Sequence, residues 1–182
     1  MTSFGGRVAA FLALGVVTGG VVGAVLSDDR NITTLTLYVL PGLVFGLVFG
    51  PLLTWCEATS ARGAAYFAIA ATGANAAAVF TAIRLFDTVK ETLHLDEPWA
   101  LAVVGVVAGA IGGGLLALVV MLIADARRAP WLTAAGALLG ALLPIFFEWE
   151  AGGAFVFYAL WQAGYAAAMA MVLPPMIEVP GP

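Results

Sequence analysis

The sequence predicts an all-α, polytopic membrane protein with six transmembrane helices, which form a single transmembrane domain over residues 1–182. Hydrophobic residues make up 63% of the chain and charged residues only 10%, whereas about 25% charged residues is usual for a soluble domain. The charged residues gather between long apolar stretches. Because backbone polar groups in hydrocarbon must be satisfied without water, we expect these stretches to be helices.

Six apolar stretches are long enough, or nearly long enough, to cross a bilayer, which takes about 20 helical residues. They are residues 8–26, 35–55, 63–86, 99–124, 130–147 and 154–173. The first is longer than the apolar region of a typical signal peptide, so we interpret it as a retained helix. The fifth is the shortest, and a protein with five crossings is the main alternative.

The orientation follows from the Lys and Arg residues of the short connecting segments, which favour the cytoplasmic side. If the N-terminus is inside, the inner segments hold Arg7, Arg62, Arg127 and Arg128, and the outer segments hold Arg30, Arg84 and Lys90. We therefore expect a multi-pass protein of a bacterial-type cytoplasmic membrane, with both termini in the cytoplasm.

The longest connecting segment, residues 86–98, has apolar residues at helical spacing and predicts an amphipathic extension of the third helix on the outer surface. Asp87, Glu91 and His94 share one face of this extension. Two carboxylates and an imidazole suit a divalent cation, but a solvated helix face explains them without one. We predict no metal site and no cofactor.

The sequence also repeats itself at an offset of about 90 residues. The run Gly-Val-Val-Thr-Gly at residues 15–19 returns as Gly-Val-Val-Ala-Gly at residues 105–109. A duplication would give units 8–86 and 99–173, each with three spans and hence inverted relative to each other, as in many transporters. Alternatively, the two halves share only the small-residue spacing that packs membrane helices.

Glycines recur every four residues along four of the predicted helices, a pattern called a glycine zipper. The four stripes are Gly15, Gly19 and Gly23; Gly42, Gly46 and Gly50; Gly105, Gly109 and Gly113; and Gly136 and Gly140. Glycine lets helix backbones approach closely, which strengthens packing in the membrane. We predict that these stripes pack helices within the chain, in a homo-oligomer or against a larger membrane complex.

Two amides lie near the middle of predicted helices, Asn75 in the third and Gln162 in the sixth. An amide in hydrocarbon must find a hydrogen-bond partner. One interpretation is a bond between helices. The other is a polar pathway for a small solute or ion, to which three nearby residues would contribute, namely Thr72, Trp161 and Tyr165.

Two acidic residues, Glu57 and Glu148, stand at the ends of the second and fifth spans. In an inverted repeat they would lie on opposite sides of the membrane, where they would suit a gate or a proton acceptor. Solvated acids at the membrane border are the alternative interpretation.

The composition also excludes several functions. A net charge of −4 with only seven Lys and Arg does not fit a nucleic-acid-binding surface. With a single cysteine, a single histidine and no nucleophile, zinc or phosphate-binding motif, we expect no enzyme. Two functions remain: a transporter or channel for a small solute or ion, or a non-catalytic membrane subunit or scaffold.

Overall fold

The computed structural model describes residues 4–27, 33–149 and 152–174, and over these residues every regular element is a helix. The helices are α1 (Phe4–Leu26), α2 (Thr34–Trp55), α3 (Ala61–Leu93), α4 (Glu97–Ala124), α5 (Trp131–Gly140), α6 (Leu143–Glu148) and α7 (Gly153–Val172). Five of them, α1, α2, α3, α4 and α7, are long and apolar enough to cross a membrane. The predicted fold class, a polytopic helical membrane protein, is confirmed.

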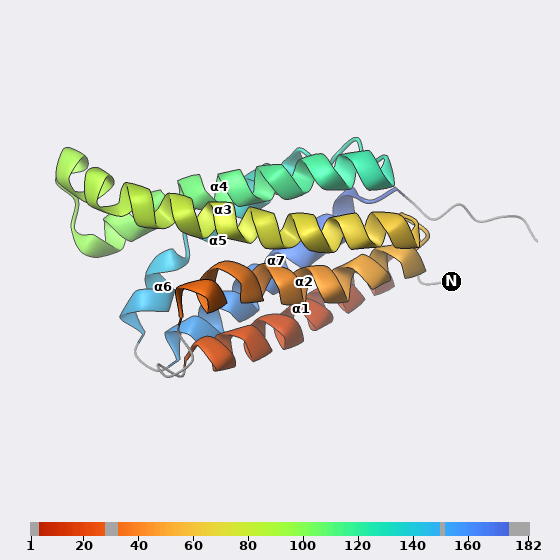
Figure 1. The fold of residues 1–182 in the computed structure, drawn as a ribbon, viewed down its shortest axis with the longest axis horizontal. Coiled ribbons are helices and arrows are strands. Elements are labelled where there is room, and N and C mark those ends of the chain that lie inside the picture. The colour runs from red at the N-terminus through yellow and green to blue at the C-terminus, as the bar shows by residue number, and fades with distance from the viewer. Residues whose placement is uncertain (1–3, 28–32, 150–151, 175–182) are drawn as a thin grey trace, which may run out of the picture.

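The remaining passage along the bundle is made by α5 and α6 together, which span residues 131–147 as a shorter apolar segment (Figure 1). The predicted fifth helix is broken because Pro144 has no N–H to donate to the Gly140 carbonyl. Around the break, Leu142 and Ile145 donate to carbonyls only three residues back, those of Leu139 and Leu142. The chain therefore makes its fifth passage as two short helices.

The two ends of the described chain lie at the same end of the bundle. Arg7 in the first turn of α1 donates hydrogen bonds to the carbonyl oxygens of Leu173 and Pro174, at 3.3 and 2.9 Å, directly after α7. The connection between α2 and α3 and the connection between α4 and α5 are also at this end (Figure 1). We call it the terminal end of the bundle.

The third helix continues into the segment for which the sequence predicts an amphipathic extension. Ser60 caps its start by accepting a hydrogen bond from the Gly63 N–H, and the helix then continues without a break for 33 residues. It ends at Leu93, and the next residue, His94, has a left-handed backbone with φ 51°. The expected amphipathic extension therefore forms the last turns of α3 itself as far as Leu93.

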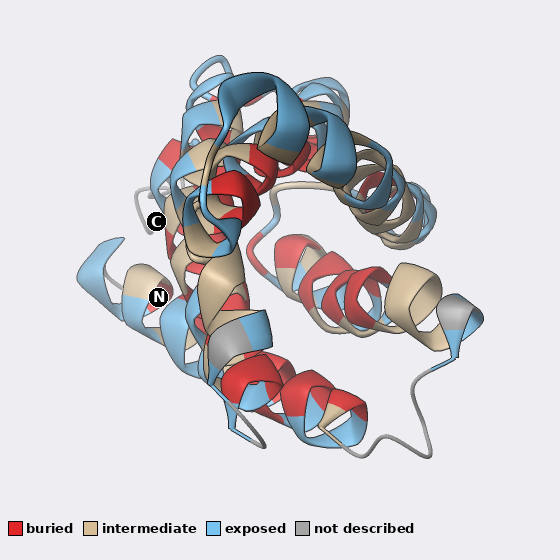
Figure 2. Cartoon of the chain, turned by 90° about the vertical axis from the view of Figure 1, so that its left-hand side faces the viewer, coloured by how far each residue is buried: buried red, intermediate tan, exposed pale blue. Residues whose placement is uncertain are grey.

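The outer surface of the bundle is apolar. Figure 2 shows buried residues turned toward the interior of the helical bundle and exposed residues turned outward. Ile69, Leu122 and Leu138 expose 71%, 73% and 74% of their surface, respectively. Side chains this apolar and this exposed fit contact with the lipid bilayer rather than with water.

Three antiparallel helix pairs make the closest contacts: α1 with α7, α2 with α3, and α4 with α5. Each pair meets along one of the predicted glycine stripes. The stripe of α1 faces residues 154–163 of α7, the stripe of α2 faces residues 64–75 of α3, and the stripe of α4 faces α5, whose own Gly136 and Gly140 line the same contact. The helix backbones touch in all three pairs, because a Cβ at these glycines would overlap backbone atoms of the opposite helix.

The glycine contacts differ between the two halves of the chain. The stripe of α1 faces α7, whereas the matching stripe of α4 faces α5 instead of α3. In addition, the stripe of α2 faces α3, whereas Gly136 and Gly140 face α4 instead of α7. The two halves therefore use corresponding glycines against non-corresponding helices, and the inverted repeat stays a prediction.

The glycine contacts predict how substitutions affect stability. A Cβ on Gly46 would lie 2.5 Å from the Cα of Ala68, whereas a Cβ on Gly73 would meet nothing within 4 Å. We expect Gly46→Ala to lower the free energy of unfolding by about 1–3 kcal/mol through overpacking. The matched control, Gly73→Ala, should leave it unchanged or raise it by up to about 1 kcal/mol.

Thermal unfolding of both variants in the same detergent measures this difference. Equal stability of the two variants would contradict the close approach of α2 and α3.

Candidate functional site

The first component of the candidate site is a proline in the first half of α2. Because Pro41 has no N–H, the carbonyl of Leu37 lacks the helical donor four residues further on. The side chain of Asn75, on α3, takes this place: its Nδ2 donates to the Leu37 oxygen at 3.2 Å and to the Tyr38 oxygen at 2.7 Å. The amide thus satisfies a backbone group that the helix cannot satisfy itself.

The second amide reaches the same turn of α2 from another helix. Gln162 on α7 is fully buried, and its Nε2 donates to the carbonyl oxygen of Pro41 at 3.3 Å. Its Oε1 has no hydrogen-bond partner. Asn75 and Gln162 therefore both tie a helix to α2 near Pro41, and they point to α2 rather than to each other.

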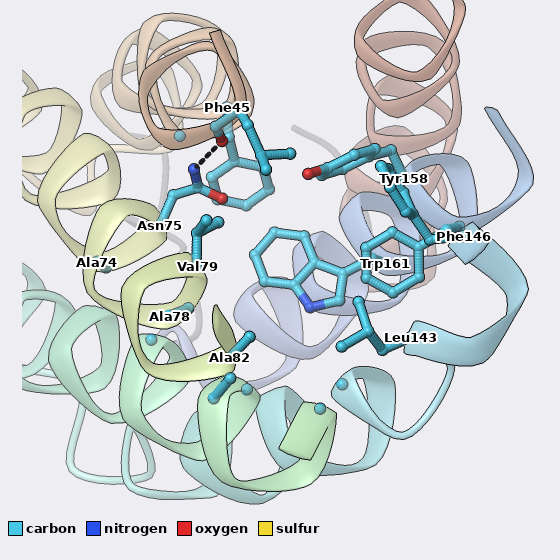
Figure 3. Close-up of a pocket in the computed structure, with 18 of the residues that line it drawn as sticks. Phe45, Ala74, Asn75, Ala78, Val79, Ala82, Leu143, Phe146, Tyr158 and Trp161 are labelled. Carbon is cyan, nitrogen blue, oxygen red and sulfur yellow. Dashed lines mark hydrogen bonds between the residues drawn. The ribbon is translucent and has the colours of Figure 1, made fainter. Parts of the chain in front are cut away.

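A cavity of about 120 Å³ lies beside this junction. Its wall comes from α2, α3, α4 and α7 and from the break between α5 and α6, with Gly140 and Leu143 at the break. Figure 3 shows Phe45, Val79, Phe146 and Trp161 around this space, with Ala78 and Ala82 on the α3 side. Small residues on α3 and α4 leave the space open, and aromatic side chains from α2, α6 and α7 close it.

The wall of the cavity is almost entirely apolar, and none of the described residues that line it carries a charge. Three polar groups belong to its lining residues: the Asn75 amide, the Tyr158 hydroxyl and the Trp161 indole N–H. In Figure 3 the side-chain oxygens of Asn75 and Tyr158 point toward the space between the labelled residues. Such a wall suits a mainly apolar molecule that carries one hydrogen-bonding group.

The aromatic part of the wall is held by ring contacts. Trp161 stacks on Tyr165 with the ring centroids 5.5 Å apart, and it meets the edge of Phe45 at 6.3 Å. Tyr165 is itself fixed, because its hydroxyl donates to the Gly113 carbonyl at 3.0 Å. The indole therefore has a defined position in the wall.

The structure brings together only part of the predicted pathway set. Asn75 and Trp161 line the cavity, whereas Gln162, Thr72 and Tyr165 are not part of its wall. The hydroxyl of Thr72 donates to the Ala68 carbonyl of its own helix at 3.0 Å. Where the sequence predicts a polar pathway, the structure has a largely apolar cavity. A role of these residues in conducting a solute or ion stays a prediction.

Neither acidic residue lines the cavity, although Glu148 directly follows the lining residue Phe147. Glu57 is exposed at the terminal end of the bundle, with a left-handed backbone of φ 56° directly after α2. Glu148 ends α6 near the opposite end, and its side chain lies outside the described part of the structure. Their predicted gating or proton-linked role stays a prediction.

No group of three or more His, Cys, Asp or Glu among the described residues is placed to hold a metal ion, and this includes Asp87, Glu91 and His94.

Several residues of the wall were not singled out by the sequence, above all Phe45, Phe146 and Tyr158. They lie on three different helices, and nothing in their local sequence distinguishes them from ordinary aromatic core residues. Pro144 was a usable signal, because a proline inside an apolar span predicts a break or a kink.

Comparison with protein-family models, with curated proteins and with solved structures finds no match for this chain. The functional conclusion therefore depends on the site alone.

The bond between Asn75 and Leu37 predicts a coupling with Pro41. Asn75→Leu should lower the free energy of unfolding by about 1–2 kcal/mol, because it leaves the Leu37 carbonyl without a donor. In a Pro41→Ala background, the helix regains the missing N–H. The cost of Asn75→Leu should then fall by half or more.

A double-mutant cycle from unfolding measurements gives this coupling directly. Thr72→Val is the control, because its hydroxyl bonds only within α3, and it should show no coupling to Pro41→Ala. Equal costs of Asn75→Leu in both backgrounds would mean that Asn75 does not replace the proline donor.

Proposed function

We propose that this integral membrane protein binds a small, mainly apolar molecule within the bilayer, in the cavity beside Pro41. The observation that carries the proposal is the wall of that cavity: apolar surface from all sides, no charged side chain among the described lining residues, and a few polar groups. A concave apolar site with a small number of polar groups is the usual form of a small-molecule site.

The size of the cavity limits the ligand. Its volume of about 120 Å³ is similar to that of an engineered apolar cavity, about 150 Å³, that stays dry and binds benzene. The part of the ligand inside the cavity is therefore of the size of one ring or a short branched chain. A hydroxyl or amine on the ligand would donate to the Asn75 oxygen, and a carbonyl would accept from Tyr158.

The ligand reaches the cavity from the lipid phase. Two residues of its wall, Ile83 on α3 and Phe147 on α6, are also 55% and 59% exposed on the outer surface. They connect the cavity with the apolar exterior of the bundle. A molecule dissolved in the bilayer would enter the site past these two apolar side chains.

Transport of such a molecule is the natural extension of binding. Broken membrane helices often form the substrate sites of transporters, and the break between α5 and α6 contributes Gly140 and Leu143 to this cavity. Conduction of ions is less well supported, because replacing the hydration shell of an ion requires several polar groups.

The second candidate is a non-catalytic membrane subunit or scaffold that packs with itself or with a larger complex. The observation in its favour is that both amides, Asn75 and Gln162, form the bonds between helices that packing alone requires. A subunit of this kind would not need a ligand in the cavity, so occupancy of the cavity separates the two candidates.

We further propose that the terminal end of the bundle faces the cytoplasm of a bacterial-type cell, because four of the seven Lys and Arg residues belong to it. A cysteine placed at position 92 should then react with a membrane-impermeant thiol reagent added outside intact cells. Reaction only after the membrane is opened would reverse the orientation.

The ligand proposal predicts the effect of filling the cavity. In the wild-type protein, a diazirine-labelled fatty alcohol should form adducts on residues of the cavity wall after illumination. Val79→Phe adds volume at the wall, so it should reduce these adducts about tenfold or more, as expected when overpacking competes with a ligand. Ile69→Phe, on the lipid-facing side of the same helix, is the matched control and should leave them unchanged.

Mass spectrometry of the labelled peptides measures both results. The opposite result would be labelling of lipid-facing residues with no enrichment of adducts at the cavity wall of the wild-type protein. It would favour a membrane subunit or scaffold over a ligand-binding protein.

A further inference from the structure

A second pocket, of about 470 Å³, opens at the terminal end of the bundle. It is formed by the start of α1, the end of α7 and the turn between α4 and α5. Its wall holds three arginines, Arg7, Arg127 and Arg128, together with one acid, Asp125. It shares no lining residue with the cavity beside Pro41.

Arg7 is the buried group of this pocket, with only 4% of its surface exposed. Two of its nitrogens donate to the Leu173 and Pro174 carbonyls, so the guanidinium closes the C-terminal end of α7. Its Nε has no hydrogen-bond partner. The guanidinium also lies over the Phe4 ring, 5.7 Å from the ring centroid. A buried charge whose described partners are neutral carbonyls and one aromatic ring is costly unless an anion accompanies it.

No carboxylate among the described residues supplies that anion. Among the residues that the structure describes, one ion pair is found, and it joins Lys90 and Glu97 at the opposite end of the bundle. Asp125 lines the pocket but is exposed and forms no ion pair with a described arginine. Among the described residues of the wall, three arginines against one aspartate give a net charge of +2.

The remaining two arginines stand at the open side of the pocket. Arg127 and Arg128 are both exposed in the turn that follows α4. Their guanidinium groups are free to turn toward an anion, and guanidinium is the side chain best suited to bind phosphate through paired hydrogen bonds.

The rim of the pocket is apolar. Phe4 and Met171 are 61% and 50% exposed, and both belong to its wall. The pocket thus combines a basic interior with an apolar border at the end of the membrane helices, where lipid headgroups meet the hydrocarbon. Basic pockets between membrane helices at this level bind anionic headgroups.

We propose that this pocket binds the phosphate of an anionic phospholipid, with Arg7, Arg127 and Arg128 around the headgroup and the acyl chains leaving along Phe4 and Met171. The site is separate from the ligand cavity, so it does not depend on the proposed function. A free phosphate group shares the same chemistry with the arginines but has no use for the apolar rim.

The test is native mass spectrometry of the full chain in detergent with equal amounts of phosphatidylglycerol and phosphatidylcholine. The wild-type protein should retain phosphatidylglycerol in preference to phosphatidylcholine. Arg127→Ala and Arg128→Ala should each weaken the retention about fivefold, and the double variant about 25-fold, if each arginine contributes as a basic residue near a membrane surface does.

Arg62→Ala is the matched control, because Arg62 is an exposed arginine at the same end of the bundle that does not line the pocket. It should leave the retention unchanged. Thermal unfolding in phosphatidylcholine alone should be the same for all these variants, which separates lost lipid binding from lost folding.

Three results would overturn the proposal. The first is equal retention of the two lipids by the wild-type protein. The second is an equal loss of retention in Arg62→Ala and in the pocket variants, which would indicate general charge attraction. The third is displacement of phosphatidylglycerol by millimolar inorganic phosphate, which would assign the pocket to a soluble phosphate group.

Discussion

The architecture depends on one constraint, the direct contact of helix backbones within three helix pairs. Apolar side chains gain little by leaving lipid for a protein interior, so membrane helices associate mainly through dispersion and hydrogen bonds at short range. Glycines four residues apart let two helix backbones come into contact along a full helix face. In α1, α2 and α4 the stripe contains three glycines, and each stripe lies against the backbone of an antiparallel partner.

The cavity follows from this pairing. Helices joined so closely in pairs leave space where the pairs meet, and the small residues of α3 and α4 do not fill it. Aromatic side chains such as Phe45 and Trp161 close the space from the other side. An interior of this kind is packed tightly within each pair and loosely between the pairs, which is the arrangement that a bound apolar molecule would complete.

Two prolines determine where polar backbone groups appear next to that space. Pro41 leaves the Leu37 carbonyl without a helical donor, and Asn75 supplies one from α3. Pro144 has the same effect on Gly140, which lines the cavity at the break between α5 and α6. The free backbone carbonyls beside the site are thus a consequence of the two prolines, and the one at Leu37 explains why an amide is needed in an otherwise apolar region.

The sequence predicted the helices well, because length and apolar composition alone decide which segments enter a bilayer. It also placed the glycine stripes, since their spacing is visible along a single helix. It did not predict which helix each stripe contacts: the stripe of α4 marks a face for close approach, but α3 and α5 were equally suitable partners.

For the same reason, the sequence showed that Asn75 and Gln162 need partners but not that both find them on α2. For Asn75, the free Leu37 carbonyl created by Pro41 was the missing signal. The cavity was beyond prediction, because its wall joins residues from six helices whose arrangement no local pattern contains.

If the cavity beside Pro41 binds an apolar molecule from the membrane, that molecule should accompany the purified protein. The most direct measurement is mass spectrometry of the organic extract of the untagged protein purified under mild conditions, compared with the extract of the Val79→Phe variant. A small apolar compound should be enriched in the wild-type extract and depleted in the variant, with the bulk phospholipids equal in both. Identical extracts would contradict it.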